Sequence, residues 1–480
     1  MTAASLNPPL RLRFAPSPTG DLHVGGLRTA LFNYLLKLKF GGSLILRLED
    51  TDPEREAPGS TERLIDDLAW AGIVFDEGIH EGGASAPYRQ SERIDLHREA
   101  LKELLERGAV YRCWCTSERL QNLREQAKRA GAPPRYDRRC RKLDPSERYV
   151  LERGSLPCVY RLATPETGTV AFDDLVRGGM SFDLRHLDDP ILIRSDGTPT
   201  SILAGTVDDH QMGVTAIIRG EEWLPSAPYQ YLIRQALNWQ QPAMGHLPLL
   251  LSEDRSKLSK RHSGSTVAQL RKEGYLPEAV CRHLVALGRS NLPPNQGWDI
   301  ASLADMFDFH AYGRADAVFS LAGLTADNAR FIRQMPQSDL ITRMEPFIEK
   351  IVPQAIDWKP DRLAQAVDLF RQDAETLRGL VEHISALITP SLQSHSILLD
   401  YPQAPRLMEL LSSRLKALDS WDSAGIKIRI VEAGKELNIK GKELFLPIRL
   451  ALTGSKHGPE LPRIAEFLGR EETLQRLARI

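Results

Sequence analysis

The sequence predicts a mixed α/β fold in its N-terminal part, which an inserted domain interrupts and an all-helical C-terminal region follows. Three observations support this fold class. An alternating apolar run over residues 10–15 precedes a glycine-containing turn and then apolar residues at helical spacing, which is the order strand, turn, helix. Residues 111–190 are rich in Arg, Pro and Asp and break this pattern. Beyond about residue 322 strand signals largely disappear and helical runs dominate.

The turn after the first strand has the features of a phosphate-binding turn. Gly25 and Gly26 allow the backbone to approach a ligand closely. The helix that follows presents unpaired N–H groups and positive dipole density, and His23 can donate to a phosphate oxygen. Taken alone, this turn is equally consistent with a purely structural role. The apolar residues expected on one face of the helix are Leu27, Ala30, Leu31, Tyr34, Leu35 and Leu38.

A second motif, far downstream, favours the phosphate interpretation. Lys257, Lys260 and Arg261 cluster beside Ser259 and His262, in a stretch whose Ser and Gly residues indicate a mobile loop. Such a loop could close on a triphosphate, although a short basic run by itself is usually a solvated surface. The two motifs together predict one ATP site.

At these residues the chain resembles the class I aminoacyl-tRNA synthetases. Residues 23–26, HVGG, match the HIGH signature of that class, and residues 257–261, KLSKR, match its KMSKS signature. Further segments narrow the resemblance to the bacterial glutamyl-tRNA synthetases. These segments are residues 13–20, 47–52, 207–210, 218–223, 440–445, 452–454 and 457–460.

The resemblance implies five parts. Residues 1–110 and 196–255 would form the two halves of a Rossmann-type parallel-sheet catalytic domain, and residues 111–195 an inserted domain that binds the tRNA acceptor stem. Residues 256–335 would hold the KMSKS loop and a stem-contact domain, and residues 336–480 an α-helical anticodon-binding domain. For the C-terminal half the alternative is a helical structural domain without ligands.

Several single elements are also predicted. A helix over residues 91–107 has a serine at its start and Gly108 as its stop. Residues 190–194 resume the α/β pattern, and residues 362–381 and 461–468 are helical runs. The face of the first of these helices is predicted to carry Ile94, His97, Leu101, Leu104 and Leu105.

A zinc site is expected in the inserted domain. Cys113 and Cys115 lie two apart at a probable strand end, and a helix then leads to Tyr136 and Cys140, so the four side chains can meet. Thiolates suit Zn²⁺, which takes four ligands in a structural site. Related enzymes with a zinc-bearing insertion use as fourth ligand either a histidine two residues after the last cysteine, where this chain has Lys142, or a tyrosine four residues before it, which favours Tyr136. The alternative is a degenerate site without metal.

The resemblance implies a two-step reaction. The carboxylate of L-glutamate attacks the α-phosphorus of ATP to give glutamyl-adenylate and pyrophosphate, and a terminal ribose hydroxyl of tRNA then takes the glutamyl group. His23 would serve the α- and β-phosphate region, and Lys257 and Lys260 would bind pyrophosphate in the transition state, with Mg²⁺ screening the polyphosphate. The implied ATP-binding residues are Thr19, His23, Gly25, Gly26, Trp223, Lys257, Ser259 and Lys260.

The resemblance also implies a glutamate pocket. Glu49 would accept from the substrate ammonium. Arg219 would bind the side-chain carboxylate, since a guanidinium pairs bidentately with a carboxylate and offers no acceptor to an amide. At two pocket positions, where relatives typically have tyrosine and asparagine, this chain has Ser201 and Gly205, so either water fills the space or the pocket differs. The implied pocket residues are Arg13, Ser17, Glu49, Ser201, Gly205 and Arg219.

Composition bounds the remaining expectations. A net charge of −1 gives no global positive field, so contacts to tRNA phosphates must come from local basic patches. Residues 1–9 lack a signal-sequence pattern, and no uncharged apolar run is long enough to span a bilayer, which predicts a cytoplasmic protein without a membrane partner. Five cysteines, an odd number, argue against a disulfide scaffold.

The expected partner is tRNA(Glu), and the resemblance implies a monomer. The main alternative is a specialised or non-discriminating paralogue that charges tRNA(Gln) with glutamate. Two further alternatives are a catalytically silent tRNA-binding paralogue and a nucleotidyltransferase that makes small adenylylated metabolites. The complete motif pair argues against the first, and the helical C-terminal residues argue against the second.

Overall fold

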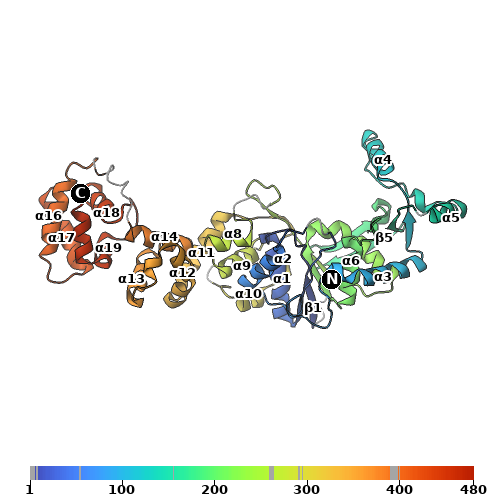
Figure 1. Ribbon diagram of the computed structural model, residues 1–480, viewed down its shortest axis with the longest axis horizontal. Helices are drawn as coiled ribbons and strands as arrows, with labels where there is room; N and C mark the ends of the chain where they lie inside the picture. The colour runs from blue at the N-terminus through green and yellow to red at the C-terminus, as the bar shows by residue number, and fades with distance from the viewer. Residues whose placement is uncertain are drawn as a thin grey trace. The chain divides into compact units, whose positions relative to one another are not determined.

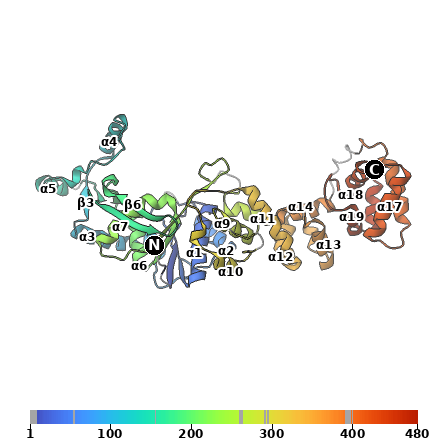
Figure 2. The ribbon, with the colours of Figure 1, turned by 180° about the vertical axis from the view of Figure 1, so that it is seen from behind.

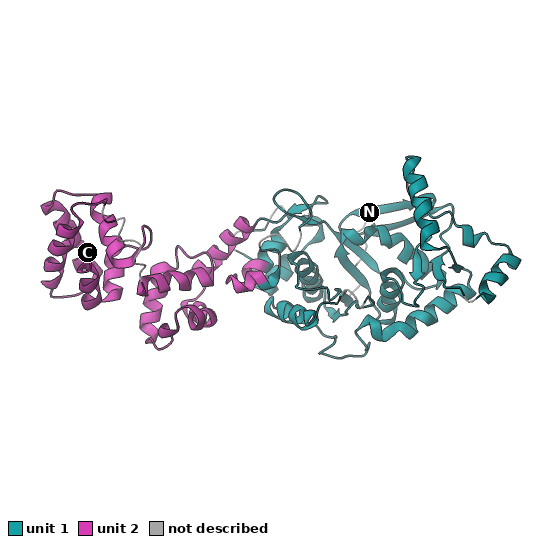
Figure 3. Ribbon diagram, turned by 45° about the horizontal axis from the view of Figure 1, so that its top comes forward, with its two compact units in different colours: residues 1–268, 281–320 teal, residues 269–280, 321–480 magenta. Residues whose placement is uncertain are grey.

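The computed structural model forms two compact units, residues 1–268 with 281–320 and residues 269–280 with 321–480 (Figure 3). Within the described residues no helix combines the length and the apolar character that crossing a membrane requires. The structure describes residues 6, 9–52, 56–154, 156–258, 264–289, 292–293, 296–389, 398 and 400–480.

Parallel strands form the centre of the first unit. β1 (Leu10–Phe14) pairs in parallel with β2 (Gly42–Leu46), and β8 (Ala216–Gly220) pairs in parallel with β9 (Ala243–Leu247). The N–H of Thr215 donates to the carbonyl of Arg11 at 2.9 Å, which sets β8 beside β1. The predicted parallel-sheet fold class is confirmed.

Helix α1 (Val24–Phe40) follows β1, as the order strand, turn, helix predicts (Figure 1). On the predicted apolar face Leu27, Ala30, Leu31, Tyr34 and Leu35 are buried. The prediction is wrong for Leu38, which lies in the last turn of the helix and is exposed. The helix ends at Gly41, whose φ of 73° lies in the left-handed region that favours glycine.

The interval predicted to be an insertion contributes to two sheets. β3 (Val110–Cys113), β4 (Val159–Leu162) and β7 (Ile191–Ile193) form an antiparallel sheet. β5 (Thr169–Asp174) and β6 (Gly178–Asp183) form a hairpin, and β5 also pairs in parallel with β9.

Residues 190–194 contain β7, which is followed by α6 (Ser201–Gln211), so the succession of strand and helix resumes here as predicted. The strand nevertheless pairs with β4 in the antiparallel sheet and not with the parallel strands. A three-residue apolar strand carries no information about which partner it will find.

Helix α3 (Ile94–Glu106) starts later than predicted. Ser91 lies in a 3₁₀ turn, Gln90–Arg93, and its N–H and hydroxyl both donate to the Asp50 carboxylate at 2.8 Å, so this serine binds a distant residue instead of capping the helix. Gly108, with φ of 70°, lies just beyond the end of the helix as predicted. On the predicted face His97, Leu101 and Leu104 are buried, and Ile94 and Leu105 are half-buried.

Two short helices, α8 (Val267–Lys272) and α9 (Pro277–Ala286), each contribute residues to both units. The remaining elements of the first unit are α2 (Ser60–Trp70), α4 (Ser117–Arg129), α5 (Pro145–Arg153), α7 (Ala227–Ala236), β10 (Leu250–Leu251), α10 (Ile300–Met306) and β11 (Ala317–Val318).

The described residues of the second unit form helices and no strand (Figures 1 and 2). This confirms the predicted helical C-terminal region. These helices are α11 (Leu321–Gln334), α12 (Gln337–Ile351), α13 (Pro360–Phe370), α14 (Leu377–Ile388), α16 (Ala404–Lys416), α17 (Ser423–Glu436), α18 (Lys442–Thr453), α19 (Leu461–Leu468) and α20 (Arg470–Leu477).

The two helical runs predicted in this region had different outcomes. The run over residues 461–468 is α19, with the predicted bounds. The run over residues 362–381 is interrupted: α13 ends at Phe370, and α14 begins after Thr376, whose side chain accepts the N–H of Gly379 at 3.0 Å. A threonine in this position is a helix N-cap, so one apolar pattern covers two helices.

Candidate active site and candidate metal centre

A cleft of about 290 Å³ opens at the carboxyl ends of β1 and β8, beside the start of α1 and α6. In open α/β sheets this edge is the usual position of a ligand site. The cleft brings together predicted site residues from the N-terminal segment, 13–49, and from the later segment, 201–223, but none from the second motif. The predicted residues that line it are Arg13, Ser17, Thr19, His23, Gly25, Gly26, Glu49, Ser201, Gly205, Arg219 and Trp223.

The glycine turn forms one wall of the cleft. His23 is the N-cap of α1, and its Nδ1 accepts the N–H of Gly25 at 3.1 Å. A Cβ atom at Gly26 would lie only 3.0 Å from Leu22 Cδ1, so the close packing of the turn on β1 and α1 favours glycine. The turn therefore exposes backbone at the start of a helix, where an anion is stabilised.

The chain that follows the second motif returns to this turn. The N–H of Val24 donates to the carbonyl of Ser265, and the N–H of Val267 donates to the carbonyl of Leu22, both at 2.9 Å. Residues some 240 positions apart in the sequence thus share backbone hydrogen bonds beside the cleft.

The second motif itself is described only in part. Lys257 is exposed, forms an isolated bridge with Leu251 and is not among the residues that line the cleft. Ser259 and Lys260 lie outside the described residues, so their predicted contacts with ATP stay predictions.

Buried charges form the floor of the cleft. Arg13 Nε lies 3.1 Å and Arg47 Nη1 2.7 Å from Asp209 Oδ1, and Arg47 Nη2 lies 3.2 Å from Glu49 Oε1. Although burial acts in the opposite direction, Arg13 and Arg47 hold the pKa of the Asp209 carboxyl well below its ordinary value. Burial raises the pKa of Glu49, against the effect of the same two arginines. Arg47 and Asp209 lie in segments that carry the family resemblance, but the sequence alone predicts no role for either residue.

Arg219 lines the cleft and has one buried guanidinium nitrogen without a hydrogen-bond partner among the described residues. Its Nε donates to His246 Nε2 at 3.1 Å, whereas its Nη2 is buried without a hydrogen-bond partner in the described part of the chain. Burial, together with the neighbouring Arg13, lowers the pKa of Arg219 from 12.5 to about 10, so the guanidinium is charged at neutral pH.

The two positions that depart from the relatives lie in the same cleft. Ser201 is the first residue of α6, and Gly205 follows one turn later. A Cβ atom at Gly205 would lie 3.7 Å from Glu49 Oε1 and 3.8 Å from Gln230 Nε2. The missing side chain therefore leaves space between Glu49 and Gln230, a buried residue that sequence reasoning did not identify.

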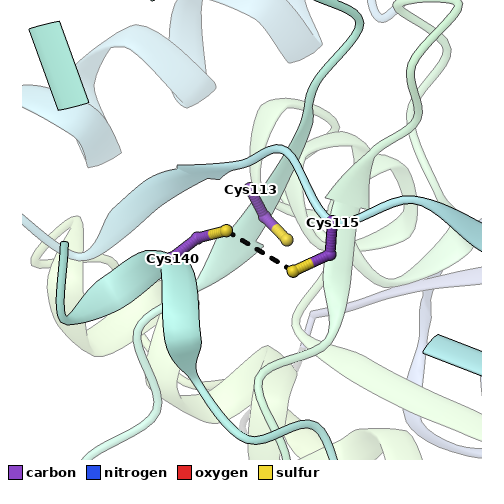
Figure 4. Close-up of side chains that lie close together, drawn as sticks. All are labelled: Cys113, Cys115 and Cys140. Atoms are coloured by element: carbon purple, nitrogen blue, oxygen red, sulfur yellow. Dashed lines mark hydrogen bonds between the residues drawn. The ribbon is translucent and has the colours of Figure 1, made fainter. Parts of the chain in front are cut away.

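Three cysteines converge in the interval between β3 and α5 (Figure 4). The Sγ atoms of Cys113, Cys115 and Cys140 lie within 4.8 Å of one another, and those of Cys115 and Cys140 are 3.5 Å apart. The Tyr136 hydroxyl lies 3.3 Å from Cys113 Sγ and 3.6 Å from Cys115 Sγ. The four predicted ligands are thus brought together.

The comparisons with known proteins agree along the whole chain. Residues 9–314 match the family model of the catalytic domain of class I tRNA synthetases (E and Q), and residues 339–480 match an anticodon-binding domain. The chain belongs to the class I tRNA synthetases. Among curated relatives, the glutamate–tRNA ligase of Heliobacterium modesticaldum is 39% identical and that of Desulforamulus reducens 36% identical. These alignments cover 98% of this synthetase in both cases, and 96% and 98% of the relatives.

Solved structures give the same assignment. This synthetase resembles a glutamate–tRNA ligase from Elizabethkingia meningosepticum, crystallised with its amino acid, at a TM-score of 0.85 with 31% identity. The match covers 98% of each chain. A glutamate–tRNA synthetase from Elizabethkingia anophelis matches with a TM-score of 0.83. The predicted family and the predicted fold class are therefore confirmed.

Proposed function

We propose that this chain attaches L-glutamate to tRNA at the expense of ATP, through glutamyl-adenylate, for protein synthesis. The observation that carries the proposal is the presence in one cleft of Arg219, with a free buried donor, and Glu49. Glutamate offers the complementary groups, a side-chain carboxylate for the guanidinium and an ammonium for the carboxylate. The names of the relatives, glutamate–tRNA ligases at 36% and 39% identity, support the same substrate.

The remaining cleft residues divide between the two small substrates. Arg13, Ser17, Ser201 and Gly205 complete the glutamate pocket. Arg13 adds positive charge near the substrate carboxylates. The single negative charge of Asp209 is shared between Arg13 and Arg47, so it does not neutralise both arginines.

ATP occupies the side of the cleft that the glycine turn forms. His23, Gly25 and Gly26 lie against its phosphates, with Thr19 and Trp223 beside the nucleotide. Lys257, Ser259 and Lys260 come from the neighbouring segment to stabilise the pyrophosphate as it leaves. The protein supplies alignment and charge stabilisation and no nucleophile. Mg²⁺, when bound to ATP, screens the charge of the polyphosphate.

The cysteine cluster is proposed to hold a structural Zn²⁺. A tetrahedral Zn²⁺ with Zn–S distances of about 2.3 Å places its sulfur ligands about 3.8 Å apart, close to the separation of 3.5 Å between Cys115 and Cys140. Hydrogen bonds from Cys140 and Tyr136 hold the pKa of Cys113 below its ordinary value, which favours the thiolate form that binds a metal. With Tyr136 as the fourth ligand, the metal would tie β3 to the turn that carries Cys140.

Metal analysis tests the zinc proposal. Protein purified without chelator should contain close to one zinc per chain, and Cys115→Ser should lower that content. Because Lys142 occupies the position of the histidine ligand of other enzymes, Tyr136→Phe should weaken zinc retention against a chelator, whereas Tyr149→Phe, at an exposed tyrosine of α5, should not. Protein without zinc would contradict the metal site and leave the catalytic proposal intact.

The partner is tRNA(Glu), with tRNA(Gln) as the second candidate because nothing in the cleft distinguishes the two nucleic acids. The match of residues 339–480 to an anticodon-binding domain supports tRNA as a partner of the helical part. We further propose the five-part domain organisation described above, a cytoplasmic location and a monomer.

One set of assays tests the function. Pyrophosphate exchange and charging are measured with glutamate or glutamine and with separated tRNA species, and tRNA is included in the exchange reaction. Glutamate should be activated and glutamine rejected. Arg219→Ala should reduce the ratio of glutamate to glutamine activation by about tenfold or more, since a hydrogen-bonded charged partner is lost. Unchanged discrimination would contradict the role of Arg219, and exchange with neither amino acid would contradict the function.

A further inference from the structure

The guanidinium of Arg219 is held from behind by a histidine and an aspartate that have no role in the proposal above. Arg219 lies on β8 and His246 on the adjacent strand β9, where the two residues are direct partners in the parallel register. His246 in turn contacts Asp174, the last residue of β5. Each of the three side chains is buried.

The geometry of these three side chains fixes the position of the proton on the His246 ring. A guanidinium has only donors, so His246 Nε2, at 3.1 Å from Arg219 Nε, must accept. The ring proton therefore lies on Nδ1 and is donated to Asp174 Oδ2 at 2.6 Å. Only the neutral form of His246 with the proton on Nδ1 fits both neighbours.

The carboxylate of Asp174 is fixed by further donors. Its Oδ1 accepts the N–H groups of Val176 and Arg177, each at 2.9 Å, and the N–H of His246 at 3.1 Å. Burial alone would raise the pKa of Asp174, but these hydrogen bonds and the one from His246 hold it below its ordinary value. Burial and the nearby Arg219 lower the pKa of His246, which favours the neutral ring that the geometry needs.

We infer that His246 and Asp174 are positioning residues for Arg219, which they hold with its Nη2 toward the side-chain carboxylate of the amino acid substrate. The inference rests on the proposed function, because it assigns the guanidinium to that carboxylate. With Nε occupied by His246, the plane of the guanidinium is set. Arg219 lines the cleft, and its Nη2 is left without a hydrogen-bond partner among the described residues. Asp174 selects the tautomer of His246 that can accept from Arg219, much as a buried aspartate orients a catalytic histidine.

The interval that carries Asp174 lies within residues 111–195, the predicted acceptor-binding insertion. β5 pairs with β9 in the same sheet as β8, so a strand of that interval reaches the rear of the amino acid pocket. A purely structural reading is that the His246–Asp174 pair only joins β5 to β9. The two readings differ in what substitutions of His246 do to substrate binding.

Two substitutions of His246 distinguish these interpretations. The side-chain amide of asparagine lies about where Nδ1 of the imidazole lies, and that of glutamine about where Nε2 lies. His246→Asn keeps a donor for Asp174 and loses the acceptor for Arg219. His246→Gln keeps an acceptor for Arg219. In pyrophosphate exchange we expect His246→Asn to raise the KM for glutamate about tenfold or more, with the KM for ATP within about twofold of the wild type. His246→Gln should raise the KM for glutamate clearly less than His246→Asn does.

A control variant and a thermal measurement complete the test. His283→Asn removes another buried imidazole of the first unit, which packs edge-on against Phe319 outside the cleft, and should leave the KM for glutamate unchanged. Thermal unfolding of each variant shows whether it is folded. A KM for glutamate that is unchanged in His246→Asn, or that rises more in His246→Gln, would overturn the inference. A wild-type protein that does not activate glutamate would instead overturn the proposed function, so the two failures are distinguishable.

Discussion

At the scale of single residues, charge balance shapes the cleft. Arg13, Arg47 and Arg219 are buried there. Asp209 pairs with both Arg13 and Arg47, and Glu49 pairs with Arg47. Burial raises the pKa of Glu49 and lowers that of Arg219, so both groups are held at a cost in the absence of a ligand. A substrate with two carboxylates and one ammonium reduces this cost, because its charges pair with the buried arginines and with Glu49. The cleft is therefore suited to an acidic amino acid before any specific contact is considered.

Gly205 offers a direct test of how the altered pocket works. Because a Cβ atom there meets its nearest neighbours at 3.7 and 3.8 Å, an asparagine fits without displacing backbone. Its amide would lie near Glu49 and Gln230, whose side chains offer an acceptor and a donor. Gly205→Asn should lower the KM for glutamate by about threefold or more in pyrophosphate exchange, as a neutral hydrogen bond of about 1 kcal/mol permits.

The size of the side chain provides the control for this substitution. Gly205→Ala adds the Cβ atom without a polar group and should leave the KM for glutamate within about twofold of the wild type. Since alanine favours helix α6 more than asparagine does, a lower KM in Gly205→Asn alone cannot come from helix propensity. A KM that rises in Gly205→Asn would mean that the substrate itself uses the space left by glycine.

Glu77 gives the first unit a stability that depends on pH. Its carboxylate pairs with Arg11 at 2.6 Å and accepts the hydroxyl of Tyr88 at 2.6 Å, and the bond from Arg11 is the main reason why the pKa of Glu77 is lowered. A carboxyl group with a lowered pKa in the folded state stabilises the protein above its unfolded pKa, near 4.3, and loses this contribution as the pH falls through the folded value. Glu77→Gln should therefore destabilise the first unit by about 1 kcal/mol at pH 7, and the difference should shrink toward pH 3.

Thermal unfolding of the full chain at both pH values measures this effect. Glu81→Gln, at an exposed position close by, should match the wild type throughout. A deficit of Glu77→Gln that is equally large at pH 3 and pH 7 would show that the carboxylate charge is not its origin.

At the scale of elements, local patterns located some boundaries and missed others. The start of α1 and both ends of α19 follow from apolar spacing and the residues next to them in the chain. The late start of α3 and the antiparallel pairing of β7 depend on Asp50 and β4, which are distant in the sequence. The site shows the same division. Arg219 lies in a recognisable segment, whereas Gln230, His246 and Asp174 gain their positions only from strand and helix packing, which no local pattern encodes.

The break between α13 and α14 depends on one threonine cap and one glycine. Thr376 accepts the N–H of Gly379, and the N–H of Leu377 donates to the carbonyl of Gly274 at 2.9 Å. Gly274 has φ of 81°, and a Cβ atom there would lie 2.5 Å from the nitrogen of Arg378, so no other residue fits without displacing the start of α14.

Thr376→Ala should therefore destabilise α14 by about 1 kcal/mol, because the first-turn N–H groups lose their acceptor. Hydrogen exchange of the full chain, followed by mass spectrometry, should show faster exchange in Leu377–Ile388 and unchanged exchange in helices of the first unit. Thr376→Ser retains the hydroxyl and should exchange like the wild type. Equal protection in the alanine variant would mean that packing alone holds the start of α14.

At the scale of the whole molecule, each unit has a core of its own. Leu203 and Ile233 lie in a buried cluster of the first unit, and Leu380 and Ile384 in a large buried cluster of the second. The residues that line the cleft all belong to the first unit. Units with separate cores can unfold in separate transitions, and a ligand stabilises only the unit that binds it.

Calorimetry of the full chain should therefore resolve two transitions, of which ATP and glutamate together raise only one. At concentrations of about 100 times Kd each ligand contributes about 2.7 kcal/mol, so the two together contribute about 5.4 kcal/mol, which for a unit of this size corresponds to a rise in Tm of about 8 °C. Thr376→Ala identifies the other transition, since it should lower the Tm of the second unit and leave the first unchanged. If the ligands and this variant shifted the same transition, the two cores would be unfolding as one cooperative body, and the separation into a substrate-binding unit and a helical unit would be contradicted.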